Sequence, residues 1–571
     1  MRSLYWRSLH GHRVRGLWIV ALLACFVLVT GLAPLVRLFA LALGPGEGGE
    51  ALGLLRETLS SRAFNRALGN TLTASGGSVL ISAALGTALA LATGLARLPG
   101  RALLGFLALS PLLIPSQIMA LAWIELMGSG SAVLGALGLA PAPGSRNPLY
   151  SGAGVAWLMG IEHMPLVFIA ARASLSGLPL DLIEAARISG AGSARILRCI
   201  VLPLTLPAIA AGSVLAFAGA VGNFGVPALL GIPGRFPVLT TLIYQRLNGF
   251  GPGVIGSVAA MALVLVALAA GALVLRHLVV RRTAVPVTAG RSFAGFETGP
   301  WRWPLAAAVW AVLLALSVLP ILALTTTALL PALGVPFGFE TATLRNFESA
   351  LASPAIRRAF ANSFLLAGAA GLVSALVALP LAWLALTARN PLARALSWLA
   401  EPAYVVPGTV LALAMILAYL RPLPLLGFSI YGTGAILLVA YLGRFLPVSL
   451  RPVEAALSAL DPALDEAARI HGVSPLRRML GIAGPAALPA AAAGALVIFM
   501  TAINELTLSA LLWSAGNETI GVQIFSLQYE GNSTAAAALS VLALAAVAIL
   551  VLVADRLGRS LPPGTLPWRA D

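Results

Sequence analysis

Twelve long runs of apolar residues constrain this chain more than any other feature of its sequence. Crossing the hydrocarbon core of a bilayer takes about 20 consecutive apolar residues, and a chain that is 59% hydrophobic and 10% charged does not fit an ordinary soluble domain. The runs do not alternate residue by residue, so they indicate helices rather than barrel strands. They cover about 16–43, 67–96, 102–127, 152–176, 204–230, 253–275, 303–330, 360–387, 395–420, 430–450, 486–512 and 534–554.

The sequence is also duplicated. "EAARISGAG" begins at Glu184 and "EAARIHGVS" begins at Glu466, 282 residues later. At the same offset Pro207 matches Pro489, and earlier in each half Pro115 matches Pro407 at an offset of 292. We therefore expect an all-α polytopic membrane protein with about 12 spans arranged as two parallel six-helix repeats. The predicted parts are a first half (1–280), a cytoplasmic linker (281–302) and a second half (303–571).

The basic residues predict the orientation of the chain in the membrane. All 36 of them are Arg, and most fall in the alternate loops that share a side with the N-terminus. Because cytoplasmic loops collect basic residues, both termini, the linker and both repeated phrases are predicted to be cytoplasmic. Since the chain has no Lys, it cannot contain an ordinary P-loop, whose Lys contacts the nucleotide phosphates. Any ATP hydrolysis must therefore come from another polypeptide.

Each copy of the repeated phrase predicts a short helix, a Gly turn and a second helix at the membrane surface. Asp461 and Pro462 suit the start of the helix in the second copy, Gly472 suits a left-handed end, and Ser474-Pro475 suits the start of the next helix. Small alanines beside the Glu leave a smooth face for another protein. A single copy would be read as an amphipathic connector, but two copies at matched places favour a docking element.

The phrase "EAARISGAGSARILRCIVLP" resembles the EAA loop of binding-protein-dependent ABC importer permeases. We refer to residues 178–203 and 460–485 as the first and second EAA loops. In the second loop, Gly484 replaces the Leu that precedes the final Pro. By this resemblance, the residues that couple the chain to its ATPases are Glu184, Ala185, Ala186, Gly190 and Arg195, and their counterparts Glu466, Ala467, Ala468, Gly472 and Arg477.

The resemblance implies a type I ABC importer fold in the bacterial inner membrane. Each EAA helix would occupy a cleft on one of two separate ATPase subunits, which hold ATP and Mg. A soluble periplasmic or lipid-anchored substrate-binding protein would deliver the cargo. The chain itself would be no enzyme and would bind no cofactor and no nucleic acid.

Fused chains of this layout look most like the ferric iron and thiamine uptake branch, and the segment at 223–245 is similar to its iron-type members. Ferric iron is therefore the expected cargo. Thiamine, phosphonate, polyamine and sulfate remain alternatives. A secondary transporter also has twelve spans in two halves, but it has no reason to carry two EAA loops.

Polar residues within apolar runs are expensive in a membrane and often functional. We predict that Asn223, Asn504 and Glu505 line the translocation path, with an ordinary interhelical hydrogen bond as the alternative. Glu162 and Arg444 occupy matched positions in the two halves and are predicted to form an intramembrane charge pair, although both could instead lie separately near an interface. No high-affinity metal cage is expected.

Overall fold

The computed structural model describes residues 18–46, 49–249, 253–283, 293, 295–296, 299–423 and 427–557. Within these ranges, eleven helices are long and apolar enough to cross a membrane, or up to twelve if a bent pair counts as one span. The predicted all-α polytopic fold is thus confirmed. The terminal arginines (Arg2 and Arg559 among them), which contributed to the predicted orientation, lie outside the described residues, as does much of the 281–302 linker.

The chain forms two compact units that cut across the halves of the sequence. One unit, called here the 353–523 unit, also includes the first span and the chain from residue 545 onward. The other, called the 45–352 unit, also includes residues 524–544. The first span of the first half therefore lies in the 353–523 unit, and the first span of the second half lies in the 45–352 unit. We call these two helices the exchanged first spans.

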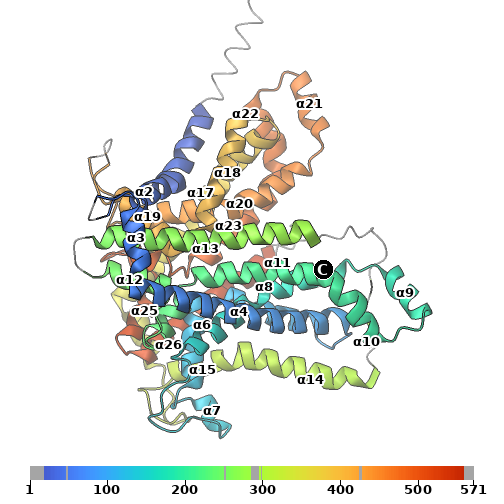
Figure 1. The fold of residues 1–571 in the computed structure, drawn as a ribbon, viewed down its shortest axis with the longest axis vertical. Coiled ribbons are helices and arrows are strands. Elements are labelled where there is room, and N and C mark those ends of the chain that lie inside the picture. Colours follow the sequence, from blue (N-terminus) through green and yellow to red (C-terminus); the bar gives the residue numbers. More distant parts are fainter. Residues whose placement is uncertain are drawn as a thin grey trace, which may run out of the picture. The chain divides into compact units, whose positions relative to one another are not determined.

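The 45–352 unit is built on α4, α8 and α11, which pack along one another (Figure 1). Its elements are α3 Gly53–Ser60, α4 Arg62–Leu95, α5 Arg101–Leu113, α6 Ser116–Met127, α7 Ala132–Ala136, α8 Gly152–Ser176, α9 Leu180–Ile188, α10 Ser193–Ile196, η2 Leu197–Val201, α11 Leu202–Gly222, η3 Pro227–Gly231, α12 Leu239–Leu247, α13 Val254–Thr283, η4 Gly299–Trp301, α14 Arg302–Leu313, η5 Leu314–Val318, α15 Leu319–Ala328 and α16 Arg345–Ala352.

The 353–523 unit repeats this plan with α17, α20 and α23, which also pack pairwise. Its elements are η1 Leu28–Leu32, α2 Ala33–Ala42, α17 Pro354–Leu386, α18 Pro391–Val405, α19 Gly408–Tyr419, α20 Gly434–Ser458, α21 Pro462–Ile470, α22 Pro475–Arg478, η6 Met479–Ala483, α23 Gly484–Ala502 and α24 Ser509–Leu512. Two further helices, α25 Ile520–Tyr529 and α26 Ser533–Leu557, pass from one unit into the other.

A π-helical turn in each exchanged first span, η1 or η5, widens the backbone just before a proline, Pro34 or Pro320. Such turns leave the helical ladder locally irregular and free carbonyl groups for other donors. The Tyr419 hydroxyl donates to the Val29 carbonyl oxygen at 2.5 Å. In the other unit, Thr327 of α15 donates to the Glu125 carboxylate of α6 at 2.9 Å. Polar contacts therefore hold each exchanged span in place.

The predicted spans at 102–127 and 395–420 are not continuous helices, because each is interrupted in the middle. The breaks fall at Pro115 and Pro407, and the preceding residues Ile114 and Val406 have extended ψ values of 125° and 132°. A residue before proline is driven out of the helical region by the proline ring. Across the second break, α18 and α19 meet at 112°.

The spans that follow the EAA loops also differ from the prediction at both ends. They begin at Ser193 and Pro475, so the second helix of each repeated phrase is the first part of a span and not a separate surface helix. They end at Gly222 and Ala502. Asn223, Asn504 and Glu505 therefore lie just beyond the helix ends, where the prediction had placed them inside spans of 204–230 and 486–512.

Candidate functional site

The two EAA loops have the same backbone geometry. In the first loop, Gly190 adopts φ +78° and donates to the Arg187 carbonyl, while Ala191 donates to the Ala186 carbonyl, both at 2.9 Å. In the second loop, Gly472 has φ +71° and the same two hydrogen bonds recur. This is a Schellman motif, and its left-handed position favours Gly. An added Cβ would meet nothing within 4 Å at either Gly, so conformation and not crowding explains the glycine.

The start of the second loop helix, α21, also follows the prediction. The Asp461 carboxylate accepts a hydrogen bond from the backbone N–H of Ala463 at 2.9 Å. This contact satisfies one of the N–H groups that a helix leaves unpaired at its N-terminus. Asp461 thus caps α21 as expected from the sequence.

Both loop helices expose apolar side chains beside the Glu that begins the repeated phrase. Ile188 is 89% exposed and its counterpart Ile470 is 84% exposed. Glu184 and Glu466 lie one helical turn earlier and are also exposed. Each loop helix therefore presents an exposed aliphatic side chain and a carboxylate at matched positions.

Within the second EAA loop, a buried ion pair joins α21 to α22, the first part of the span that follows. Arg478 bonds the Asp465 carboxylate, and the two side chains are 11% and 13% exposed. The Arg478 guanidinium also lies 5.7 Å from the centre of the Trp383 ring. The sequence prediction for this loop did not include the contact between Asp465 and Arg478.

At the matched positions of the first loop, the ion pair is replaced by two isoleucines. Ile183 corresponds to Asp465 and Ile196 to Arg478, and both isoleucines are fully buried or nearly so. This replacement of two apolar residues by opposite charges is visible in the duplicated sequence and could have indicated the ion pair.

The first EAA loop is instead held by the linker between the halves. The Phe293 N–H donates to the Leu178 carbonyl at 3.0 Å, and the Phe296 N–H donates to the Leu95 carbonyl at 2.7 Å. The Arg187 guanidinium lies 5.7 and 6.0 Å from the centres of these two Phe rings. We call the two described linker residues Phe293 and Phe296 the strap, a support that the sequence did not indicate.

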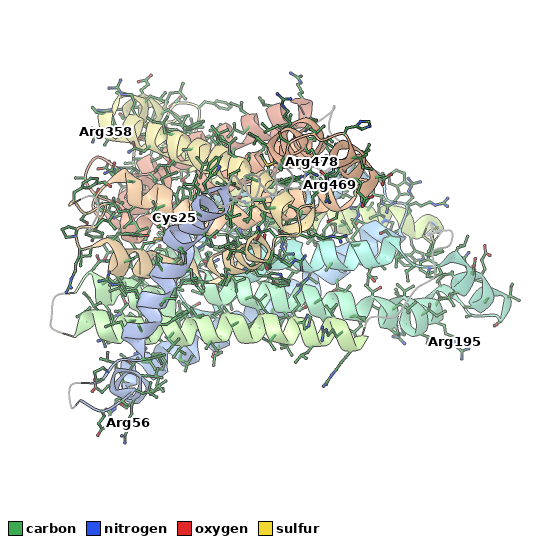
Figure 2. The ribbon with its side chains drawn as sticks, turned by 90° about the horizontal axis from the view of Figure 1, so that it is seen from above. Cys25, Arg56, Arg195, Arg358, Arg469 and Arg478 are labelled. Carbon is green, nitrogen blue, oxygen red and sulfur yellow. The ribbon has the colours of Figure 1, made fainter. Side chains whose placement is uncertain are left out.

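Arg195 and Arg477, the basic members of the predicted coupling set, are both exposed. Figure 2 shows Arg195 at the edge of the 45–352 unit, and it shows Arg469 and Arg478 along the second EAA loop. Neither Arg195 nor Arg477 is needed to fasten its loop, so both are available to a partner.

A second set of polar residues lies where α11 ends. The Asn223 side chain donates to one Glu162 oxygen at 2.8 Å, and the Ser116 hydroxyl donates to the other. The Asn223 side-chain oxygen accepts from the Val226 N–H at 3.2 Å, and its backbone carbonyl accepts from Thr240 at 2.8 Å. Glu162 is thereby connected to α6, α8 and the loop after α11 within one unit.

The matched residues after α23 carry different charges. The Glu505 carboxylate accepts from the backbone N–H of Leu508 at 2.8 and 2.9 Å and from that of Ser509 at 3.2 Å. Arg444, which corresponds to Glu162, acts on Glu505 electrostatically. Among the described residues, the buried Nη1 atom of Arg444 has no hydrogen-bond partner. The 45–352 unit thus pairs the acid Glu162 with the amide Asn223, and the 353–523 unit places the base Arg444 near the acid Glu505.

Each unit has one glycine packed closely against a hydroxyl-bearing residue next to these polar side chains. A Cβ added at Gly225 would lie 2.7 Å from the Ser116 Cβ, while one added at Gly408 would lie 2.7 Å from the Thr507 Cγ2. Ser116 corresponds to Gly408, and Gly225 corresponds to Thr507. Each unit therefore has one glycine at this close approach. In the 45–352 unit it lies after α11, and in the 353–523 unit it lies at the start of α19.

The structure brings Asn223 to Glu162 and places Arg444 near Glu505, each within its own unit. The pairing of Glu162 with Arg444 stays a prediction. Asn504 is buried, at 5% exposure. Within the described part of the chain, no group of three or more His, Cys, Asp or Glu side chains is placed to hold a metal ion.

Comparison with known proteins gives two matches to one family model. The model is described as "Binding-protein-dependent transport system inner membrane component", and it matches residues 86–285 and 375–566. Each match contains one EAA loop, so the duplication seen in the sequence corresponds to two copies of the family's domain.

Relatives match both the whole chain and parts of it. The probable ABC transporter permease protein y4fN of Sinorhizobium fredii is 27% identical over 521 residues, which are 89% of this chain and 90% of that protein. The ferric transport system permease protein FbpB of Actinobacillus pleuropneumoniae is 24% identical over 518 residues, 89% of this chain and 73% of that protein. The molybdenum transport system permease protein ModB of Escherichia coli K12 is 32% identical over 177 residues, 30% of this chain and 73% of that protein.

Proposed function

Because the chain belongs to the family of binding-protein-dependent transport system inner membrane components, and is thus an ABC importer permease, we propose that it forms the complete translocation path of one importer. Two family domains in one chain supply the two halves that such a path requires. We place the end bearing the EAA loops, with both termini, in the cytoplasm, since arginines collect there.

We propose that the two EAA loops dock two separate ATPase subunits, which hold ATP and Mg. The observation that supports this most directly is the matched exposure of Ile188 and Ile470 on helices outside the bundle. An exposed aliphatic side chain gains free energy when a partner's cleft removes it from water. Glu184 and Glu466 then add a charged contact at each cleft.

Replacing both Ile188 and Ile470 with Asp is expected to abolish ATPase docking. A buried interface anchor contributes ~2 kcal/mol or more, so losing two should lower the affinity by well over about tenfold. The measurements are co-purification of the ATPase and ATP-driven uptake into proteoliposomes. Phe339→Asp is the control, because Phe339 is fully exposed in the loop between α15 and α16. Wild-type docking by the double variant would refute the assignment, and uphill uptake without any ATPase would refute an ATP-driven importer.

For the path itself, we propose that Asn223, Asn504 and Glu505 line the route at the ends of α11 and α23. Its support is that α11 and α23 end close to matched places, after Gly222 and Ala502, and are followed by buried polar residues. Within a membrane, irregular backbone is tolerated only where it lines a cavity or is buried in protein. Glu505 is the acidic member of this set.

Glu505→Gln is expected to reduce uptake about tenfold or more while leaving the amount of folded protein unchanged. The substitution keeps the shape of the side chain but removes its charge, and it leaves one oxygen to accept the N–H groups of Leu508 and Ser509. Uptake in proteoliposomes and thermal unfolding are measured together. Glu518→Gln is a matched control, since Glu518 also accepts a backbone N–H, that of Gly516, in the same unit. Undiminished uptake by Glu505→Gln would exclude a role in the path.

We propose ferric iron as the cargo, delivered by a soluble periplasmic or lipid-anchored substrate-binding protein. The support is the relative named for ferric transport, which matches 89% of this chain, whereas the relative named for molybdenum transport matches 30%. Thiamine, phosphonate, polyamine and sulfate are the alternatives. Calorimetry on the cognate binding protein tests this: tight binding of chelated Fe(III) is expected, and binding of another solute without Fe(III) would replace the assignment.

A further inference from the structure

An apolar cavity lies beside the first EAA loop. Its volume is about 490 Å³, within the ~300–1,000 Å³ range of pockets that hold small molecules. The walls come from the end of α4, the start of the span after the loop, the strap and the start of α14. Among the lining side chains, Ser193 contributes a hydroxyl and Trp301 a ring N–H, and the others are Ala, Leu and Phe.

The strap is both a wall of this cavity and a support of the first EAA loop. Phe296 lines the cavity, is joined to Leu95 through its N–H, and forms an isolated bridge with Ala96. The same Phe296 ring lies against the Arg187 guanidinium of α9. On the other side, Ser193 and Ala194 belong to the first turn after the Gly190 turn. Anything that fills the cavity therefore contacts both the strap and the first EAA loop itself.

Three arginines are direct chain neighbours of residues that line the cavity, and Trp301 is itself a lining residue. Arg97 follows the lining residue Ala96, Arg195 follows Ala194, and Arg302 follows Trp301, and all three arginines are exposed. Trp301 and Trp303 are 75% and 67% exposed at the start of α14. Tryptophans of this kind mark the interface between membrane and water, and basic pockets between membrane helices on the cytoplasmic side bind anionic lipid headgroups.

We propose that this cavity binds one acyl chain of an anionic phospholipid, whose phosphate lies among Arg97, Arg195 and Arg302. Charge complementarity selects this occupant, because the apolar lining suits a hydrocarbon chain and the three guanidinium groups suit a phosphate. The bound lipid presses the strap against α9 and so stabilises the first EAA loop. The inference rests on the proposed function only in placing the first EAA loop and this cavity at the cytoplasmic membrane surface.

The test uses the full-length chain in nanodiscs of equal phosphatidylglycerol and phosphatidylcholine, followed by detergent extraction and native mass spectrometry of retained lipid. The wild type is expected to retain phosphatidylglycerol preferentially. Arg97→Gln with Arg302→Gln should reduce this preference about fivefold for each arginine. Ala92→Trp fills the cavity and should remove both lipids. Arg281→Gln, at the exposed end of α13, is the control for general surface charge and should behave as wild type.

Several outcomes would overturn the proposal. Equal retention of the two lipids by the wild type would exclude headgroup recognition, and unchanged retention by Ala92→Trp would exclude the cavity. Displacement of the lipid by inorganic phosphate would indicate an anion site without an acyl chain. Thermal unfolding identifies a misfolded Ala92→Trp variant, for which the smaller change Ala88→Leu is substituted. Because the readout uses neither an ATPase nor cargo, its failure is distinguishable from failure of the proposed importer function.

Discussion

Asp465→Ala is expected to destabilise the second EAA loop by ~3–5 kcal/mol, because removing one partner of a buried ion pair leaves the other charge uncompensated. The remaining charge is the Arg478 guanidinium, which is 11% exposed and lies over Trp383. The helix α21 should then detach from α22, and ATP-driven uptake should fall more than about tenfold. Thermal unfolding of the purified chain and uptake with the ATPase present measure the two effects.

The double variant Asp465→Ile with Arg478→Ile is expected to restore both properties. It copies Ile183 and Ile196, which are buried at the matched positions of the first loop. Replacing a buried ion pair with apolar residues is often neutral or stabilising. Here the pair also leaves the Asp465 Oδ1 and Arg478 Nε atoms without hydrogen-bond partners among the described residues, so its desolvation is incompletely offset.

A surface pair in the same unit provides the matched control. Arg451 and Glu401 form an ion pair in which the side chains are 62% and 30% exposed. Exposed pairs contribute only ~0–1 kcal/mol, so Glu401→Gln should change stability little. If Asp465→Ala were as mild as Glu401→Gln, or if the double isoleucine variant stayed inactive, the ion pair would not be what holds α21 against α22.

Gly443→Ala is expected to displace the exchanged first span from α20. A Cβ at this position would collide with the backbone carbonyl of Thr30 in the π-helical turn η1. A backbone atom cannot swing aside as a side chain does, so the cost should reach or exceed the ~1–3 kcal/mol typical of overpacking. The shift would also lengthen the Tyr419 to Val29 hydrogen bond of 2.5 Å.

Thermal unfolding, together with limited proteolysis of the first span, measures this effect. Gly481→Ala is the control, because Gly481 also lies in a helix of the 353–523 unit but an added Cβ there meets nothing within 4 Å. Alanine is a better helix former than glycine by up to ~1 kcal/mol, so this control should be neutral or slightly stabilising. Equal behaviour of the two variants would show that the first span does not depend on the close approach at Gly443.

Several features of this protein could be predicted from local sequence patterns. Apolar length predicted the spans, and the 152–176 run matches α8 residue for residue. The Gly turns at Gly190 and Gly472 and the Asp461 cap follow from backbone preferences that act within four residues. The breaks in the third and ninth spans could also have been predicted, because Pro115 and Pro407 occupy matched positions and a residue before proline avoids the helical conformation.

Other features depend on residues that are far apart in the chain. The exchange of first spans, the strap at Phe293 and Phe296, and the contact of Asn223 with Glu162 join segments between 61 and hundreds of residues apart. Hydrophobic periodicity says which face of a helix is apolar but not which helix covers it.

The sequence by itself thus determined that this chain is a duplicated, membrane-spanning helical protein with two loops of one design. Only the tertiary structure decided how each loop helix is held, α21 by the Asp465–Arg478 pair and α9 by the strap. The physical reason is that local propensities act along a single segment, whereas a buried charge or a close-packed glycine is defined by its neighbours in space.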